Sequence, residues 1–271
     1  MSKKPIMHKA RKRFGQNFLH DLGIIRRILR EINPKPGQHL VEIGPGLGAL
    51  TEELLEEAGA LDAVELDRDL IPVLRTKFFR YEDNFRIHEA DALKFDFSSL
   101  KQDDQPLRIV GNLPYNISTP LIFHLLSFSG LISDMHFMLQ NEVVDRLAAG
   151  PGDNHYGRLG IMAQYFCRVE KLFMVPPGAF QPAPKVDSAI VRLTPYETLP
   201  LVARDVKVLQ EVVRTAFSQR RKTLRNNLKP MIDATTLETL GIDPQLRPER
   251  LPLEDFIKIS DAIVIRQQEE N

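Results

Sequence analysis

The chain of 271 residues has one cysteine, no net charge and no long apolar run. The single cysteine, Cys167, cannot form an internal disulfide. The seven histidines are scattered without the paired spacing of metal ligands, so we expect no metal site. No stretch approaches the roughly 18 apolar residues of a membrane span, and the basic start lacks the apolar segment of a secretory signal. These absences predict a cytoplasmic globular protein.

Charge is balanced in total but unevenly distributed. The 36 lysines and arginines equal the 36 aspartates and glutamates, yet residues 2–13 and residues 212–232 contain cations and no acid. Clustering raises the local potential toward phosphates, because screening limits the reach of distant carboxylates to about 10 Å. Either cluster alone also fits a solvated surface, but the two together favour a nucleic-acid partner.

Short apolar strands alternate with helical patterns in the first part of the chain, which predicts an α/β fold. The strands are short and apolar, as in a covered parallel sheet. The proline-rich residues 175–186 cannot form the interior of a helix, so we expect a loop there. The expected elements are helices 21–32, 49–59 and 67–78 and strands 39–43, 61–67, 85–91, 107–112, 134–139, 167–175 and 187–193.

Beyond Leu199 the sequence loses strand-like runs and becomes helical in pattern, at residues 206–228 and 253–268. We therefore expect two domains. Residues 1–199 would form the α/β domain. Residues 200–271 would form a smaller helical domain that carries the second basic cluster.

Three glycines, Gly44, Gly46 and Gly48, follow an apolar strand and open a helix. Glycine lets the backbone approach a ligand closely. With Ala49 the segment also satisfies the dinucleotide-binding pattern G-x-G-x-x-A. By itself the loop fits a dinucleotide site, a nucleoside site or a tight turn without a ligand.

Two acids stand at the ends of the next two strands. Glu65 lies about 20 residues beyond the glycine loop, where a carboxylate can accept hydrogen bonds from both ribose hydroxyls. Asp91 closes the following strand, where it can accept a hydrogen bond from an adenine amine. Each acid alone fits a solvated strand end, but together they favour a nucleoside cofactor in one crevice. NAD and S-adenosylmethionine share the ribose, so both fit these two acids.

The segment Asn112-Leu113-Pro114-Tyr115 ends the fourth strand. An exocyclic adenine amine is a poor nucleophile, because its lone pair is delocalised into the ring. The Asn112 side-chain oxygen and the Pro114 carbonyl can accept both amine hydrogens and aim the lone pair at a methyl donor, while Tyr115 stacks on the base. Positioning supplies much of the rate, and no strong base is needed. These residues predict methyl transfer from S-adenosylmethionine to adenine, with a chance turn as the alternative.

Six segments occur in this order: RKRFGQNFL at 11–19, VEIGPGLGALT at 41–51, VELDRDL at 64–70, GNLPYNISTP at 111–120, FQPAPKVDSAIV from Phe180, and FSQRRKTLRNNL at 217–228. With them the chain resembles, nearly end to end, the bacterial small-subunit ribosomal RNA adenine dimethyltransferases. The resemblance implies a class I methyltransferase fold, with a seven-stranded, mostly parallel sheet and a small helical C-terminal domain. It also implies dimethylation of two adjacent adenines in a hairpin near the 3′ end of the RNA.

The resemblance also implies roles for single residues. Phe180 would oppose Tyr115 across the extruded base, although an aromatic residue in a proline-stiffened loop also suits a core position. Cofactor contacts would come from Asn17, Leu19, Gly44, Glu65, Asp91 and Asn112, of which Asn112 borders both ligands. The family's RNA-facing region would correspond to Arg220, Arg221, Lys222 and Arg225.

Three other functions stay open. A dehydrogenase could use the glycine loop and Glu65, but no hydride-acceptor site stands out and the NLPY segment has no role there. A nonenzymatic assembly factor that binds immature small subunits also fits the resemblance. So does a large-subunit RNA methyltransferase, although NLPYNIS and FQPAPKVDS favour the small-subunit type. We predict an S-adenosylmethionine-dependent small-subunit ribosomal RNA adenine N6-dimethyltransferase that acts as a monomer during late subunit assembly.

Overall fold

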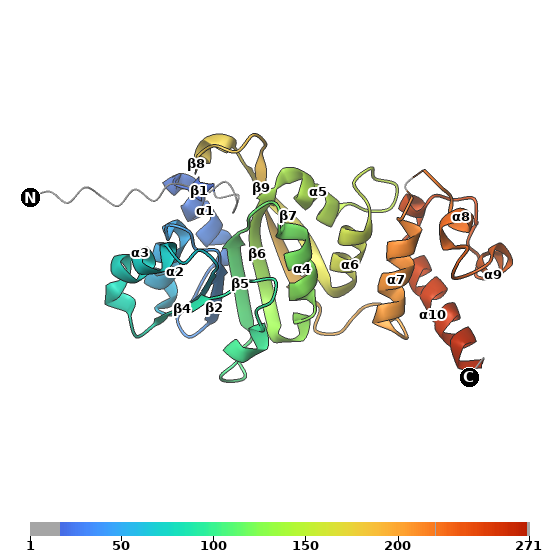
Figure 1. Ribbon diagram of the computed structural model, residues 1–271, viewed down its shortest axis with the longest axis horizontal. Coiled ribbons are helices and arrows are strands. Elements are labelled where there is room, and N and C mark those ends of the chain that lie inside the picture. The colour runs from blue at the N-terminus through green and yellow to red at the C-terminus, as the bar shows by residue number, and fades with distance from the viewer. Residues whose placement is uncertain (1–16, 220, 270–271) are drawn as a thin grey trace, which may run out of the picture. The chain divides into compact units, whose positions relative to one another are not determined.

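The computed structural model describes residues 17–219 and 221–269, which form two compact units (Figure 1). The first unit contains the described residues up to Val144 together with Glu170–Pro195. The second contains Asp145–Val169 and the described residues from Tyr196 onward. The separation near Leu199 into two domains stays a prediction, because compactness alone does not establish independent folding.

A seven-stranded sheet lies at the centre of the first unit, in the order β4-β3-β2-β5-β6-β9-β7 (Figure 1). Its neighbours from β4 to β6 are parallel, and β9 runs antiparallel to β6. The predicted mostly parallel sheet of seven strands is therefore confirmed. The strands are β2 (His39–Ile43), β3 (Leu61–Glu65), β4 (Phe85–Glu89), β5 (Leu107–Asn112), β6 (Ile132–Gln140), β7 (Cys167–Val175) and β9 (Ser188–Pro195).

The position of each strand in the sheet explains its composition. All five residues of β3 are buried, as expected for a parallel strand covered on both faces. In β4 the side chains of Arg86 and Glu89 are exposed, because this strand forms the edge of the sheet. The expectation of uniformly covered strands is wrong for β4, since strand order cannot be read from a single strand.

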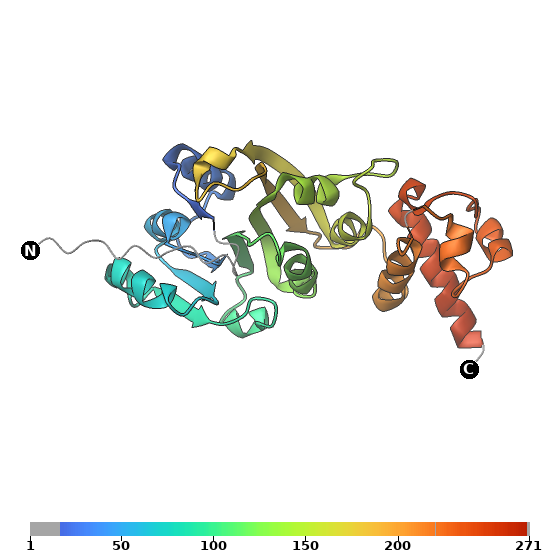
Figure 2. The ribbon, with the colours of Figure 1, turned by 45° about the horizontal axis from the view of Figure 1, so that its top comes forward.

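Helix α1 (Leu22–Ile32) begins at Asp21, whose carboxylate accepts hydrogen bonds from the backbone amides of Gly23 and Ile24 at 2.8 and 3.0 Å. It ends at Asn33 in the left-handed conformation, with φ at 49°. The helices α2 (Ala49–Ala58) and α3 (Leu70–Lys77) follow β2 and β3. Helix α4 (Ser118–Leu126) lies on the opposite face of the sheet from α1 (Figure 2).

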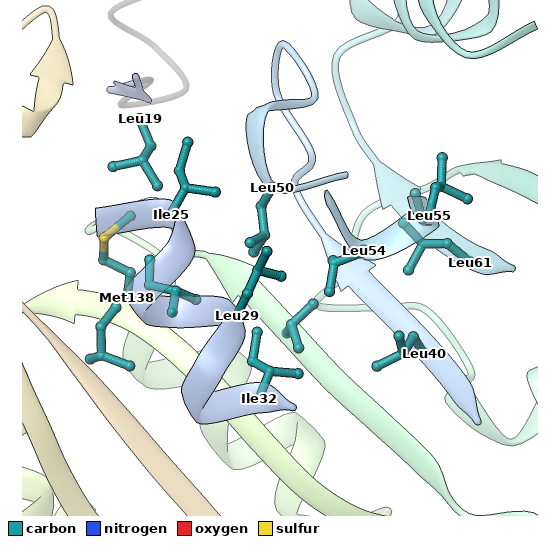
Figure 3. Close-up of a cluster of buried hydrophobic side chains, with 14 of the residues drawn as sticks. Leu19, Ile25, Leu29, Ile32, Leu40, Leu50, Leu54, Leu55, Leu61 and Met138 are labelled. Carbon is teal, nitrogen blue, oxygen red and sulfur yellow. The ribbon is translucent and has the colours of Figure 1, made fainter. Parts of the chain in front are cut away.

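One buried apolar cluster joins α1 and α2 to the sheet. Figure 3 shows Leu29 of α1 and Leu54 of α2 directed toward each other above the strands. Leu40 of β2 and Met138 of β6 close the cluster from the sheet side. This packing fixes the segments that precede and follow the glycine loop.

A short second sheet holds the N-terminal described residues in place. Strand β1 (Phe18–Leu19) pairs antiparallel with β8 (Phe180–Gln181), and Leu19 lies opposite Phe180. The proline-rich stretch is therefore an ordered loop that contains a short strand, where we expected only a loop. Pairing with β8 holds β1 so that the preceding residue, Asn17, lies at the end of β5 in the large sheet.

The second compact unit is mainly helical. Asn227 lies in it and donates through Nδ2 to the carbonyl oxygens of Ala216 and Gln219 at 2.6 and 3.1 Å. The helical pattern expected over 206–228 is split into two helices, and Asn227 supplies a hydrogen bond to the Ala216 carbonyl oxygen, which has no partner within its own helix. None of the helices in the described ranges is long and apolar enough to cross a membrane. Outside the first unit's helices, the chain forms α5 (Asn141–Ala148), α6 (Arg158–Phe166), α7 (Val206–Ala216), α8 (Leu224–Leu228), α9 (Ala234–Thr239) and α10 (Leu253–Glu269).

Candidate active site

A pocket of about 360 Å³ opens at the carboxyl ends of the parallel strands in the first unit. This is the edge at which open α/β sheets bind ligands, because the loops after neighbouring strands diverge there. The pocket lining includes residues 17–19, 42–47, 64–67, 90–92 and 111–117. Every residue predicted to contact the cofactor, and every predicted catalytic residue except Phe180, belongs to this lining.

The glycine loop adopts a backbone that other residues rarely reach. Gly44, Gly46 and Gly48 have φ values of 66°, 60° and 78°. A Cβ atom on Gly48 would lie 2.5 Å from the ring of Phe78, so this glycine also permits close packing against the end of α3. A Cβ atom on Gly46 would lie 3.2 Å from the ring of Phe18, which precedes α1. The loop therefore presents its backbone to the pocket and is held from both sides.

Glu65 ends β3 and is only 6% exposed. Its Oε1 accepts a hydrogen bond from the amide of Asp67 at 2.8 Å, and its Oε2 accepts one from the amide of Gly46 at 3.4 Å. Burial raises the pKa of this carboxyl. Each oxygen keeps a further lone pair, so a carboxylate braced in this way can still accept hydrogen bonds from two ribose hydroxyls.

Asp91 lies two residues beyond the end of β4 rather than at its last position. Its Oδ1 accepts a hydrogen bond from the amide of Leu93 at 3.0 Å. The neighbouring amide of Ala90 donates to the carbonyl oxygen of Glu65 at 3.1 Å, which ties the two acidic loops together. Asp91 lines the pocket together with Glu65, as expected for two acids that follow neighbouring parallel strands.

Asn112 is the last residue of β5 and lines the pocket. Its Nδ2 donates to the carbonyl oxygen of Asn17 at 3.0 Å, which draws the N-terminal segment to this strand end. This bond holds the amide group in place and leaves its oxygen, the acceptor atom, for a ligand. The strand can carry this residue into the pocket only with glycine at 111, since a Cβ atom there would lie 2.7 Å from the carbonyl oxygen of Ile43.

Tyr115 is half-buried in the pocket wall, next to Pro114. Its hydroxyl forms a 2.8 Å hydrogen bond with Oγ of Ser188, which is fully buried at the start of β9. Burial raises the pKa of the phenol, so the ring stays neutral. The bond fixes the tilt of the ring. Ser188 is a positioning residue that sequence reasoning missed, because it is 73 residues away in the chain.

Phe180 is not brought into the pocket wall. Its side chain is 2% exposed and belongs to the apolar cluster that joins α1 and α2 to the sheet. The β1–β8 pairing places it opposite Leu19 and turns it inward. Of the two positions that the sequence allowed, the structure has the core position, so the role of a stacking wall would require the loop to rearrange.

Glu42 is a further buried acid that sequence reasoning missed. It lies on β2, is 2% exposed and borders the pocket. Thr51 donates a 2.6 Å hydrogen bond from its Oγ1 to the carboxylate. Burial raises the pKa of Glu42 to about 7, and the nearby charge of Glu65 contributes in the same direction. The sequence feature that could have identified Glu42 is its place as an acid in the otherwise largely apolar strand that leads into the glycine loop.

The predicted RNA-facing residues lie in the second unit or outside the described residues. Arg221, Lys222 and Arg225 are exposed. Arg220 lies outside the described residues, and so does the whole N-terminal basic cluster at 2–13. Asn227 of α8 donates hydrogen bonds to the carbonyl oxygen of Ala216, the last residue of α7, and to that of Gln219 in the connecting segment.

Comparison with known proteins matches the chain to one family over most of its length. A family profile described as "Ribosomal RNA adenine dimethylase" matches residues 7–264. The "Ribosomal RNA small subunit methyltransferase A" of Hahella chejuensis is 67% identical over 258 residues, covering 95% of this chain and 94% of the relative. The protein of the same description from Marinobacter nauticus is 70% identical over 256 residues, covering 94% and 92%.

Solved structures with the same fold include related RNA methyltransferases. A dimethyladenosine transferase from Plasmodium falciparum has a TM-score of 0.76 and 29% identity, covering 93% of this chain and 98% of that one. The 23S rRNA methyltransferase ErmE has a TM-score of 0.70 and 24% identity, covering 92% and 100%, and its likeness shows the fold alone. The predicted class I methyltransferase fold is confirmed, and the dehydrogenase alternative is wrong.

Proposed function

The chain belongs to the ribosomal RNA adenine dimethylase family, and on that premise we propose how its pocket works and on which RNA it acts. It is a methyltransferase that uses S-adenosylmethionine. We infer that it dimethylates the N6 amines of two adjacent adenines in the 3′-terminal hairpin of small-subunit ribosomal RNA. The observation that carries this proposal is one pocket lined by the acids Glu65 and Asp91 and by Asn112, Pro114 and Tyr115.

The residues of the cofactor side fit a nucleoside with a charged amino-acid tail. Glu65 supplies carboxylate oxygens for ribose hydroxyls, and Asp91 supplies one for the adenine amine. The glycine loop presents backbone where side chains would block the approach of the methionine part, and Asn17 and Leu19 cover it. When bound, S-adenosylmethionine supplies an electrophilic methyl group on a sulfonium.

The residues of the substrate side orient the attacking amine. Asn112 accepts one hydrogen of N6 through its side-chain oxygen, and Pro114 accepts the other through its carbonyl. Tyr115, held by Ser188, stacks on the base. Bound S-adenosylmethionine would supply the methyl carbon for the new N–C bond and would leave as a neutral thioether, while the amine held by these residues would release its proton to water. After the first methylation one N–H remains, so the second transfer needs only one of the two acceptors.

The small-subunit RNA is the substrate that the relatives favour. Two relatives at 67% and 70% identity carry small-subunit names, whereas the large-subunit enzyme ErmE is only 24% identical. We place the reaction in the cytoplasm, where subunits are assembled, and the active species as a monomer. An additional role as an assembly factor would use the same RNA contacts.

A parallel substrate assay tests this function. The protein is incubated with labelled S-adenosylmethionine and one of four acceptors: unmethylated small subunits, free small-subunit RNA, large subunits or DNA. We expect label in small subunits or their RNA, in two adjacent dimethylated adenines near the 3′ end. Label confined to large subunits or DNA would overturn the proposed substrate.

The exposed cations of the second unit are proposed to bind RNA phosphates. Arg221 and Lys222 border a turn that Asn227 holds, and no pocket residue lies in this unit. Reversing the charges of Arg220, Arg221 and Lys222 should lower the slope of log affinity against log salt by roughly 0.7–0.9 per lost contact. Cofactor affinity should not change. Arg204→Glu/Lys207→Glu in the same unit is the control, and a wild-type salt slope in the triple variant would reject the assignment.

A further inference from the structure

The exposed face of α1 in the first unit is formed largely by arginine. Arg26, Arg27 and Arg30 are exposed, whereas Ile28 and Leu29 between them are buried. Figure 3 shows Ile25, Leu29 and Ile32 of α1 directed into the core. Helical spacing places Arg26 and Arg30 on another side of the helix from these residues. Arg26 and Arg30 are four residues apart, which places them on one face about 6 Å apart along the axis.

The acids near this face are already engaged. Glu31 of α1 pairs with Arg192 at 3.0 Å, and Glu170 of β7 approaches the same guanidinium at 3.8 Å. Asp21 accepts hydrogen bonds from the first amides of the helix. Within the described part of the chain, neither Arg26 nor Arg30 has an ion-pair partner. The positive potential of this face is therefore left for a ligand from outside.

Arg27 is held in place by the sheet. Its guanidinium carbon lies 3.9 Å from the centre of the Phe173 ring on β7. Stacking on an aromatic ring fixes the guanidinium plane while leaving its N–H groups at the rim, where they can donate to an anion. Such a preordered cation loses less side-chain entropy on binding than a free one.

Helix α1 begins close to the pocket along the chain. Leu19 lines the pocket, and α1 begins three residues later at Leu22. At a rise of about 1.5 Å per residue, Arg26 lies about 6 Å and Arg30 about 12 Å along the helix from Leu22. Asn17, just before this segment, is bonded through its carbonyl oxygen to Asn112. A strand whose base occupies the site can therefore follow α1 away from the pocket.

We propose that the α1 arginine face, formed by Arg26, Arg27 and Arg30, binds phosphates of the RNA that flanks the target adenine. This inference rests on the proposed function and adds a contact surface in the catalytic unit itself. It would position the strand next to the pocket, whereas the cations at 221 and 222 lie in the other compact unit. The ligand chemistry is that of successive RNA phosphates, which suit paired guanidinium groups.

The test compares two double charge reversals in the full-length protein. Arg26→Glu/Arg30→Glu alters the face without touching the stacked Arg27. Arg75→Glu/Arg80→Glu changes the net charge equally on exposed residues at and just beyond the end of α3, and serves as the matched control. Binding to unmethylated small subunits is measured across a salt series, together with S-adenosylmethionine affinity and methylation kinetics.

We expect the α1 variant to lose roughly 0.7–0.9 from the salt slope for each contact removed, and the control to keep the wild-type slope. The KM for the subunit should rise, while kcat at saturating subunit and cofactor affinity stay near wild type. Wild-type slope and KM in the α1 variant, with the wild type active on small subunits, would overturn this inference alone. Failure of the wild-type protein to bind or methylate small subunits would instead overturn the proposed function. Equal losses in both variants would mean nonspecific attraction and would also reject the assignment.

Discussion

The side chain of Asn112 donates a 3.0 Å hydrogen bond through Nδ2 to the carbonyl oxygen of Asn17, which is 95 residues earlier in the chain. The bond joins the end of β5 to residues 17–19, which line the same pocket and which we propose cover the cofactor. It also holds the orientation of the amide group, whose oxygen is the atom with which Asn112 can accept a hydrogen bond from an amine. One side chain would thus link the proposed cofactor cover to the proposed recognition of the base.

Glu65→Gln should weaken the binding of S-adenosylmethionine. The variant keeps the size of the side chain but loses the charge that strengthens hydrogen bonds from the ribose hydroxyls, a contribution of roughly 1.5–3 kcal/mol, or about 10- to 150-fold in Kd. Titration calorimetry measures the change, with circular dichroism as the check on folding. Unchanged affinity in a folded variant would remove Glu65 from the cofactor site.

Glu42 should make the stability of the protein depend on pH. Burial raises its pKa from 4.5 to about 7 in the folded chain, so the unfolded chain ionises first as the pH rises. The free energy of unfolding should therefore fall between about pH 4.5 and 7, by up to roughly 3 kcal/mol. Glu42→Gln should flatten this part of the profile. Urea unfolding at pH 5 and pH 8 tests this, and parallel profiles for both proteins would contradict it.

Tyr115→Ala should lower turnover more than cofactor affinity, because it removes a stacking surface worth roughly 1–3 kcal/mol per base.

Ser188→Ala should reproduce part of the loss caused by Tyr115→Ala, because it frees the tyrosine ring. Its effect should not add to that of Tyr115→Phe, since both remove the same hydrogen bond. Methylation kinetics of Ser188→Ala, Tyr115→Phe and the double variant measure the coupling between the two side chains. Full additivity would mean that Ser188 does not position the tyrosine.

Phe180→Ala should act on stability rather than directly on substrate. Its ring is buried in the core, and removal of a buried phenylalanine costs roughly 3–5 kcal/mol. Chemical denaturation should show this loss, and Leu54→Ala provides a comparison from the same cluster. A variant with wild-type stability but poor turnover would indicate that Phe180 leaves the core to contact the base.

Much of the site could be predicted from sequence because its signals are local. The residue type of Gly44, Gly46 and Gly48 indicates a backbone conformation with positive φ. Glu65 and Asn112 are recognisable because each ends an apolar strand. The parallel order of those strands then brings them to one edge. The same reasoning placed Asp91 correctly at the pocket although it lies two residues past the strand.

The parts that escaped prediction depend on contacts between distant residues. Nothing around Ser188 marks it as the partner of Tyr115, since the bond spans 73 residues. The environment of Phe180 is decided by the β1–β8 pairing, which no local pattern in the proline-rich loop reveals. The membership of residues 145–169 in the second compact unit likewise depends on packing against segments beyond residue 196.

Single-turnover methyl transfer by Asn112→Ala tests whether the Asn112 side-chain oxygen orients the adenine amine. Unmethylated small subunits are mixed with a saturating excess of enzyme that is loaded with S-adenosylmethionine, so that the rate reports the chemical step and not the binding of either ligand. Because a preorganised acceptor at the reacting amine is lost, we predict a rate lower by on the order of 10²-fold or more. Methyl transfer at the wild-type rate would contradict the account, because the Asn112 oxygen would then have no part in orienting the adenine amine.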